Sequence, residues 1–77
     1  MADIQYTVTE HIGVLSTNSR CTLELNMVSW NGKPEKYDLR RWQSDSNAKI
    51  MYKGMTFNEE EAQALYSLLK ARFEAVK

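Results

Sequence analysis

Apolar and polar residues alternate over the first two-thirds of the chain, and this pattern predicts β-strands. The first segment has apolar residues at even positions: Ile4, Tyr6, Val8, Ile12 and Val14. Glu10 and Gly13 interrupt the alternation, so we expect a bulge or bend within residues 10–13. A turn should follow at residues 17–19, where Thr, Asn and Ser occur in succession.

Segments 21–30 and 36–42 show the same alternation and predict two more strands. The connecting residues 31–35 have strong turn chemistry, because Gly32 can adopt a positive φ and Pro34 stops ladder pairing. The loop holds an odd number of residues, so odd positions of both strands share one face. These positions are apolar and suit a core packed under a helix: Leu23, Leu25, Met27, Tyr37 and Leu39.

The last third predicts a short strand and then a helix. Residues 49–57 form the strand, bent at Gly54, after a polar loop at residues 43–48. Asn58 is a good helix N-cap, and Glu61 three residues later completes a capping box. The helix then carries an apolar stripe at helical spacing: Ala62, Leu65, Leu69, Phe73 and Val76.

These elements predict an α+β fold of order β-β-β-β-α, in which a curved four-stranded antiparallel sheet carries one C-terminal helix on one face. No linker, repeat or low-complexity tract interrupts residues 1–77, so we expect a single domain. A chain of this size buries only about 60–65% of its unfolded surface, and one core is marginal. The single cysteine, Cys21, cannot form an internal disulfide, so oligomerisation is the expected source of further stability.

Composition indicates a folded protein of the cell interior. The chain is 43% hydrophobic and 26% charged, which argues against disorder. No apolar run approaches the roughly 20 residues that a membrane span needs. The first six residues have no basic or apolar signal-peptide region, so we expect a cytoplasmic protein.

Charge is distributed unevenly although the net charge is zero. Residues 19–53 contain seven Lys or Arg and four Asp or Glu, and their net charge is +3. Both ends of the chain are acidic. Because local charge governs binding to polyanions, the middle third is the candidate binding region.

The even positions of the two middle strands combine tryptophans with cations: Val28, Trp30, Lys36, Arg40 and Trp42. We expect this face to meet water. Indole rings that lie open beside Lys and Arg form a platform on which unpaired bases stack, while the cations follow the phosphates. Two alternatives stay open at this point: Trp30 and Trp42 can pack in the core or a subunit interface, and the cations can form an ordinary solvated face.

At these residues the sequence resembles the single-stranded-DNA-binding domain of the transcriptional coactivator positive cofactor 4, most closely its bacterial YdbC-type branch. Three stretches carry the resemblance, in the family's order and spacing: Trp30-Asn31-Gly32-Lys33, then Tyr37-Asp38-Leu39-Arg40 followed by Trp42, then Lys53-Gly54-Met55-Thr56-Phe57-Asn58. The resemblance covers roughly residues 20–72. It implies a curved four-stranded sheet with a C-terminal helix, a homodimer formed through helices and sheet, and grooves on the sheet that hold single strands.

The resemblance also implies residue roles. Trp30 and Trp42 would stack on bases, and Lys33, Arg40 and Lys53 would contact phosphates. Lys36 joins them by position on the same face. The regulatory Ser/Lys-rich tail of animal members is missing, so nucleic-acid binding is expected to carry over and transcriptional coactivation is not.

The expected function is therefore binding of single-stranded DNA with little sequence preference, in transcription or DNA maintenance. A protein–protein interaction module anchored by the two tryptophans is the alternative, as is an RNA-binding protein. No residue pattern supports catalysis, a metal site or a cofactor: His11 has no partner at ligand spacing, and no nucleophile elbow or phosphate-cradling glycine loop occurs.

Overall fold

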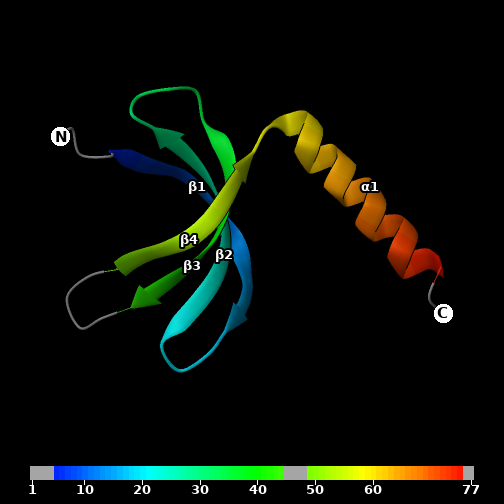
Figure 1. Cartoon of the computed structure of the whole chain (residues 1–77), viewed down its shortest axis with the longest axis horizontal. Coiled ribbons are helices and arrows are strands. Elements are labelled where there is room, and N and C mark those ends of the chain that lie inside the picture. Colours follow the sequence, from blue (N-terminus) through cyan, green and yellow to red (C-terminus); the bar gives the residue numbers. More distant parts are fainter. Residues whose placement is uncertain (1–4, 45–48, 76–77) are drawn as a thin grey trace.

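The computed structural model describes residues 5–44 and 49–75 of the chain (Figure 1). Four strands precede one helix: β1 (Tyr6–Thr17), β2 (Cys21–Trp30), β3 (Lys36–Ser44), β4 (Lys49–Phe57) and α1 (Glu59–Ala75). The strands pair in the order β1-β2-β3-β4, and every pair is antiparallel. The predicted α+β fold of order β-β-β-β-α is thereby confirmed, with an open four-stranded antiparallel sheet.

β1 is bent by three successive irregularities. Its register against β2 shifts between Val8 and Glu10, between His11 and Gly13, and between Val14 and Ser16. The bend predicted within residues 10–13 is confirmed, and the third shift lies beyond it. Each bulge inserts one extra residue and increases the local twist and bend of the strand. As a result Val8, His11 and Val14 share one face although they are three residues apart.

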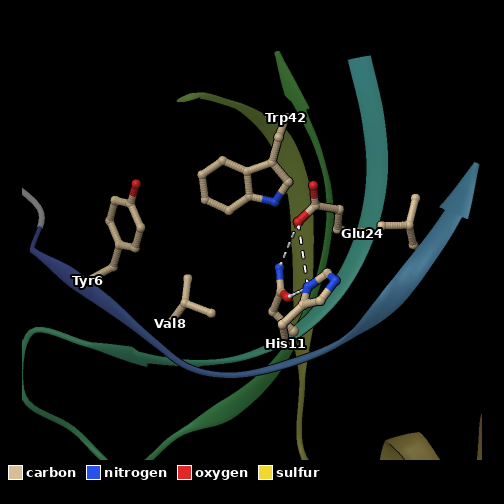
Figure 2. A pocket seen from close by; sticks show the side chains of 7 residues that line it. Tyr6, Val8, His11, Glu24 and Trp42 are labelled. Carbon is tan, nitrogen blue, oxygen red and sulfur yellow. Dashed lines mark hydrogen bonds and ion pairs between the residues drawn. The ribbon is translucent and has the colours of Figure 1, made fainter. Parts of the chain in front are cut away.

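The sheet curves around the face that carries the even positions of β2 and β3. In the close-up, the ribbons of β1 and β2 arc around Trp42, Glu24 and His11 (Figure 2). We call this the concave face. Its central residues are the buried ones: Glu24, Asn26, Val28, Asp38 and Trp42. The expectation that the even positions meet water is therefore wrong for the centre of this face.

The opposite, convex face carries the odd positions that were expected to form a core under the helix. Leu23, Leu25 and Leu39 are only half-buried, and Met55 is exposed. Among the described residues of α1, none is buried. In Figure 1 the helix leaves the end of β4 and projects away from the sheet. A single residue, Asn58, connects β4 to α1, so the direction of β4 sets the direction of the helix.

The turns and the helix start follow local sequence chemistry. Asn31 and Gly32 have φ angles of 52° and 76°, as expected for the tight connection between β2 and β3. The capping box is confirmed: Asn58 Oδ1 accepts a hydrogen bond from the Glu61 N–H at 2.8 Å, and Glu61 Oε1 accepts one from the Asn58 N–H at 2.9 Å.

The end of the third strand differs from the sequence prediction. The polar loop predicted at residues 43–48 is shorter, because Gln43 and Ser44 still pair with β4. Residues 45–48, Ile4 and Val76 lie outside the described residues. Within the described ranges, no helix is long and apolar enough to cross a membrane.

Candidate nucleic-acid interface

A hollow of about 370 Å³ opens on the concave face (Figure 2). Its walls come from β1, its floor from β2, and one side from β3. The lining residues are Tyr6, Val8, His11, Val14, Glu24, Asn26 and Trp42. The bulges of β1 bring the lining residues of this strand to one face of the sheet. The hollow therefore depends on the register shifts of β1.

Three aromatic rings gather beside this hollow. The ring centroid of Tyr6 lies 5.7 Å from that of Trp30 and 5.9 Å from that of Trp42. These are favourable tilted aromatic contacts. Trp42 is only 3% exposed, so it forms a wall of the hollow and does not lie open to solvent as expected. Tyr6 is 39% exposed and Trp30 is half-buried, so these two rings present the accessible aromatic surface.

Sequence reasoning assigned no functional role to Tyr6. It stands at the start of the first strand, and the pairing Tyr6 with Trp30 is what brings it to the tryptophans. That pairing depends on three register shifts along β1, which alternation alone does not reveal.

Arg40 is held by partners inside the chain. Its guanidinium donates two hydrogen bonds to the carboxylate of Asp38, both 2.7 Å long, and a third of 3.1 Å to the Tyr52 carbonyl. The guanidinium carbon lies 5.0 Å from the Trp30 ring centroid, which is a cation–π arrangement. Since Asp38 is fully buried, this bidentate pair fixes Arg40 against Trp30. Arg40 therefore supports Trp30 directly.

Lys33, in the loop after β2, and Lys36, at the start of β3, lie beside Trp30 at one end of the concave face. The sequence analysis placed Lys36 on the same face as Trp30 and Lys33 in the connecting loop. Together with Trp30, Pro34 and Thr56 they line a second, smaller hollow of about 240 Å³. The connecting loop is braced by hydrogen bonds, since the Ser29 hydroxyl donates to the Lys33 carbonyl at 2.7 Å. Both lysines are exposed. Two cations thus flank the accessible ring of Trp30.

Lys53 is not part of this group. The register between β3 and β4 shifts between Arg40 and Trp42, so Tyr52 and Lys53 together lie opposite Arg41. Lys53 lines a separate hollow with Leu23, Leu39 and Arg41, residues of the convex face. Arg40 also lines this hollow, whereas neither tryptophan does. Arg41 is a cation that the sequence analysis did not single out.

A polar chain forms the floor of the concave hollow. The Thr22 hydroxyl donates to Glu24 Oε2 at 2.5 Å, and Asn26 Nδ2 lies 3.5 Å from Glu24 Oε1. His11 Nδ1 lies 2.6 Å from Asn26 Oδ1 and 3.8 Å from Glu24 Oε1. Figure 2 shows the His11, Asn26 and Glu24 contacts as dashed lines. Glu24 and Asn26 were not predicted as site residues, because only the curvature of the sheet turns them into a common hollow.

A fourth hollow, of about 470 Å³, lies between α1 and the convex face. Its lining is mostly apolar and includes Leu15, Leu25, Leu39, Leu65, Tyr66 and Leu69. At one end, the Tyr37 hydroxyl donates to Glu59 Oε1 at 2.8 Å. This hydrogen bond, followed by desolvation, raises the pKa of Tyr37 above its ordinary value of 10.0. Hydrogen bonds from Gln63 and then Tyr37 lower the pKa of Glu59 below its ordinary value of 4.5.

Comparison with known proteins gives one informative relative. No family model matches the chain. A protein of Treponema pallidum (strain Nichols), described as uncharacterized, is 46% identical to the chain over 70 residues. The match covers 90% of this chain and 80% of that protein. The chain therefore belongs to the same protein family as this Treponema pallidum protein.

Proposed function

We propose that the chain binds single-stranded DNA along its concave face. The observation that carries this proposal is the cluster of Tyr6, Trp30 and Trp42, which has exposed ring surface on Tyr6 and Trp30 and two exposed lysines beside it. Aromatic faces stack on any base, so this mode of binding tolerates sequence. Duplex DNA offers no unstacked bases to such rings, which favours single strands.

The charges on the concave face suggest how a strand would lie. Glu24 and the Asp38–Arg40 ion pair are at its centre, whereas Lys33 and Lys36 are at its end beside Trp30. Carboxylates repel phosphates and lysines attract them. The sugar-phosphate backbone would therefore follow the lysines, and the bases would point toward the rings. A binder of this kind would act on exposed single strands in the cytoplasm, during transcription or DNA maintenance.

Fluorescence anisotropy of a labelled oligothymidylate of about twelve nucleotides tests the proposal. Binding should weaken with salt, with a log–log slope of about −0.7 for each phosphate contacted. An affinity that does not change with salt concentration would contradict the proposed phosphate contacts. Absence of binding would overturn the proposal. The same titration with oligouridylate distinguishes DNA from RNA, and tighter binding of RNA would favour the RNA-binding alternative.

Trp30 provides the matched variants for this assay. Trp30→Ala should weaken oligothymidylate binding by about 1–3 kcal/mol, because one base loses the indole ring on which it stacks. Trp30→Phe keeps an aromatic face and should lose less. Lys36→Ala should reduce the steepness of the log–log salt slope by the amount expected for about one phosphate contact. Lys70→Ala, on the exposed surface of α1, should leave the slope unchanged. Unchanged affinity of a folded Trp30→Ala protein would exclude this ring from the interface.

The proposal includes a homodimer, in which a second copy covers the convex face and the apolar side of α1. Among the described hydrophobic residues, only Val28 and Trp42 are buried within one chain. The helix meanwhile exposes five large side chains: Leu65, Tyr66, Leu68, Leu69 and Phe73. Contiguous apolar surface of this extent marks an interaction site on a small domain. A second copy is the natural occupant, because each isolated chain would lack a sufficient core.

A further inference from the structure

An exposed tyrosine lies among cations on the convex face, outside the interface proposed above. Tyr52 is 45% exposed, and its hydroxyl donates a hydrogen bond to Gln43 Oε1. Arg41 and Lys53 are exposed, and together with Tyr52 they line a hollow of about 690 Å³. One aromatic ring, held at its hydroxyl end, therefore shares a hollow with two exposed cations.

These two cations have no partner in the part of the chain that the structure describes. Neither the Arg41 nor the Lys53 side chain forms an ion pair or a hydrogen bond there, whereas Arg40 is bound to Asp38. No Asp or Glu is among the described residues that line the hollow. Cations that lie unpaired on an exposed surface attract polyanions.

The hollow and the concave interface lie on opposite faces of β4, which is an edge strand of the described sheet. Thr56 lines the concave hollow beside Trp30, and Gly54, two residues earlier, lines the convex one. Gly54 is exposed and has no side chain, so β4 is narrow at this point. Arg40 links the two surfaces, because its guanidinium carbon lies 5.0 Å from the Trp30 ring centroid and the residue also lines the convex hollow.

We propose that the hollow at Tyr52 is a second stacking subsite for single-stranded DNA, an inference that rests on the proposed function. The strand leaves the concave rings, crosses β4 at Gly54 and places one more base on the Tyr52 ring. Arg41 and Lys53 contact the phosphates beside that base. Stacking on an aromatic ring beside cations is the general mode by which proteins hold single strands.

The proposed homodimer leaves this part of the convex face open. The apolar hollow beside α1 and the hollow at Tyr52 share only Leu39 among their described lining residues. A second copy that covered the hollow at Tyr52 would bury Arg41 and Lys53, and an unpaired charge is costly to bury. A polyanion instead neutralises both cations.

Two oligothymidylates, of about six and about sixteen nucleotides, test the subsite by fluorescence anisotropy, because only the longer strand reaches both faces. Tyr52→Ala should weaken binding of the longer strand by roughly five- to hundredfold, the loss expected for one stacked base, and leave the shorter strand unaffected. Tyr52→Phe keeps the ring and should retain most of the affinity. Trp30→Ala should weaken binding of both strands.

Arg41→Ala supplies an independent readout. It should reduce the steepness of the log–log salt slope by about 0.7 for the longer strand, as expected for one phosphate contact, and leave the slope for the shorter strand unchanged. Lys70→Ala, on the exposed surface of α1, is the matched control and should change neither slope. If Tyr52→Ala fails to fold by circular dichroism, Arg41→Ala decides.

The possible results separate the subsite from the proposed function. Folded Tyr52→Ala protein that binds the longer strand as tightly as the unaltered protein would overturn the subsite and leave the proposed function standing. Equal losses for both strands, with a fall in mass by analytical ultracentrifugation, would assign the hollow to a second copy and also overturn the subsite. Absence of binding by every oligonucleotide would overturn the proposed function, and the subsite with it.

Discussion

Asp38 has the most demanding environment among the residues of the concave face. Its carboxylate is fully buried, and Arg40 donates two hydrogen bonds to it at 2.7 Å. A buried charge is tolerated only when it is paired and hydrogen-bonded. The pair also fixes the guanidinium against Trp30, so one ion pair supports both stability and the aromatic surface.

Removing the carboxylate should therefore be costly. Asp38→Ala leaves the Arg40 guanidinium, whose side chain is largely buried, without its partner, and should lower the free energy of unfolding by about 3–5 kcal/mol. Urea denaturation at a fixed protein concentration measures the change. Glu60→Ala, which removes an exposed carboxylate from α1, should stay within about 0.5 kcal/mol. A loss from Asp38→Ala no larger than that of the control would show that the pair contributes nothing.

Tyr37 and Glu59 form the hydrogen bond that joins β3 to the first turn of α1, and each shifts the pKa of the other. The pKa of Tyr37 is raised, so its contribution to stability is complete below the ordinary value of 10.0 and is lost as pH rises through the folded-state pKa. The pKa of Glu59 is lowered, so its contribution is present above 4.5 and is lost as pH falls through the folded-state pKa. The bond should be complete between these two limits.

Titration of the labelled tyrosine ring carbons by NMR tests this pair. In the unaltered protein, Tyr37 should titrate above the ordinary tyrosine pKa of 10.0. Glu59→Ala removes the acceptor and should bring the pKa of Tyr37 back toward that value. Glu60→Ala should leave it raised, since Glu60 is not among the residues that shift it. Equal effects of the two variants would contradict the assignment.

At the scale of elements, β3 and β4 approach too closely for a side chain at position 54. A Cβ on Gly54 would lie 2.0 Å from Arg40 Cβ and 2.6 Å from the Leu39 carbonyl oxygen. Gly54→Ala should therefore displace β4 or Arg40 and cost about 1–3 kcal/mol or more in the free energy of unfolding. Gly13→Ala is the matched control in β1, where a Cβ would meet nothing within 4 Å, and should cost under about 1 kcal/mol. Thermal unfolding measures both variants, and equal losses of stability would contradict the close approach of β3 and β4.

Local chemistry predicted much of this element order. Asn58 and Glu61 predict the start of the helix, and Gly32 and Pro34 predict the connection between β2 and β3. Both features can be predicted because they depend on neighbouring residues alone.

The face of Lys53 also follows from alternation, because it lies two residues before Met55, which pairs with Leu39 on the convex face. The pairing of Met51 with Trp42 could not be predicted in this way, because strand alternation contains no information on where an extra residue is inserted.

At the scale of the whole molecule, alternation correctly separated the two faces of β2 and β3 but not their burial. The even face is the buried one because the sheet curves around it, and the bulges of β1 contribute to that curvature. The consequence for the site is specific. Trp42 becomes a wall, Tyr6 and Trp30 supply the exposed rings, and Glu24 becomes a floor. The odd face, which has the apolar character of a core, is left half-covered in one chain.

That half-covered face leads to the prediction for assembly. The chain, of 9.0 kDa, should sediment at twice this mass at micromolar concentration. Phe73 is 71% exposed in a single chain, so its replacement should hardly change the stability of a monomer. The same replacement should weaken a dimer that buries this ring. Phe73→Glu should weaken association by about 3–6 kcal/mol per dimer, because two rings lose their burial.

Ser67→Glu adds the same charge on the opposite, polar side of α1 and provides the control. It should leave the dimer intact. Analytical ultracentrifugation over a range of concentrations, together with the concentration dependence of the melting temperature, separates loss of association from loss of folding. A stable monomer in the unaltered protein, with a melting temperature independent of concentration, would contradict the dimer. The convex face would then need another occupant, because one chain buries so little of its own apolar surface.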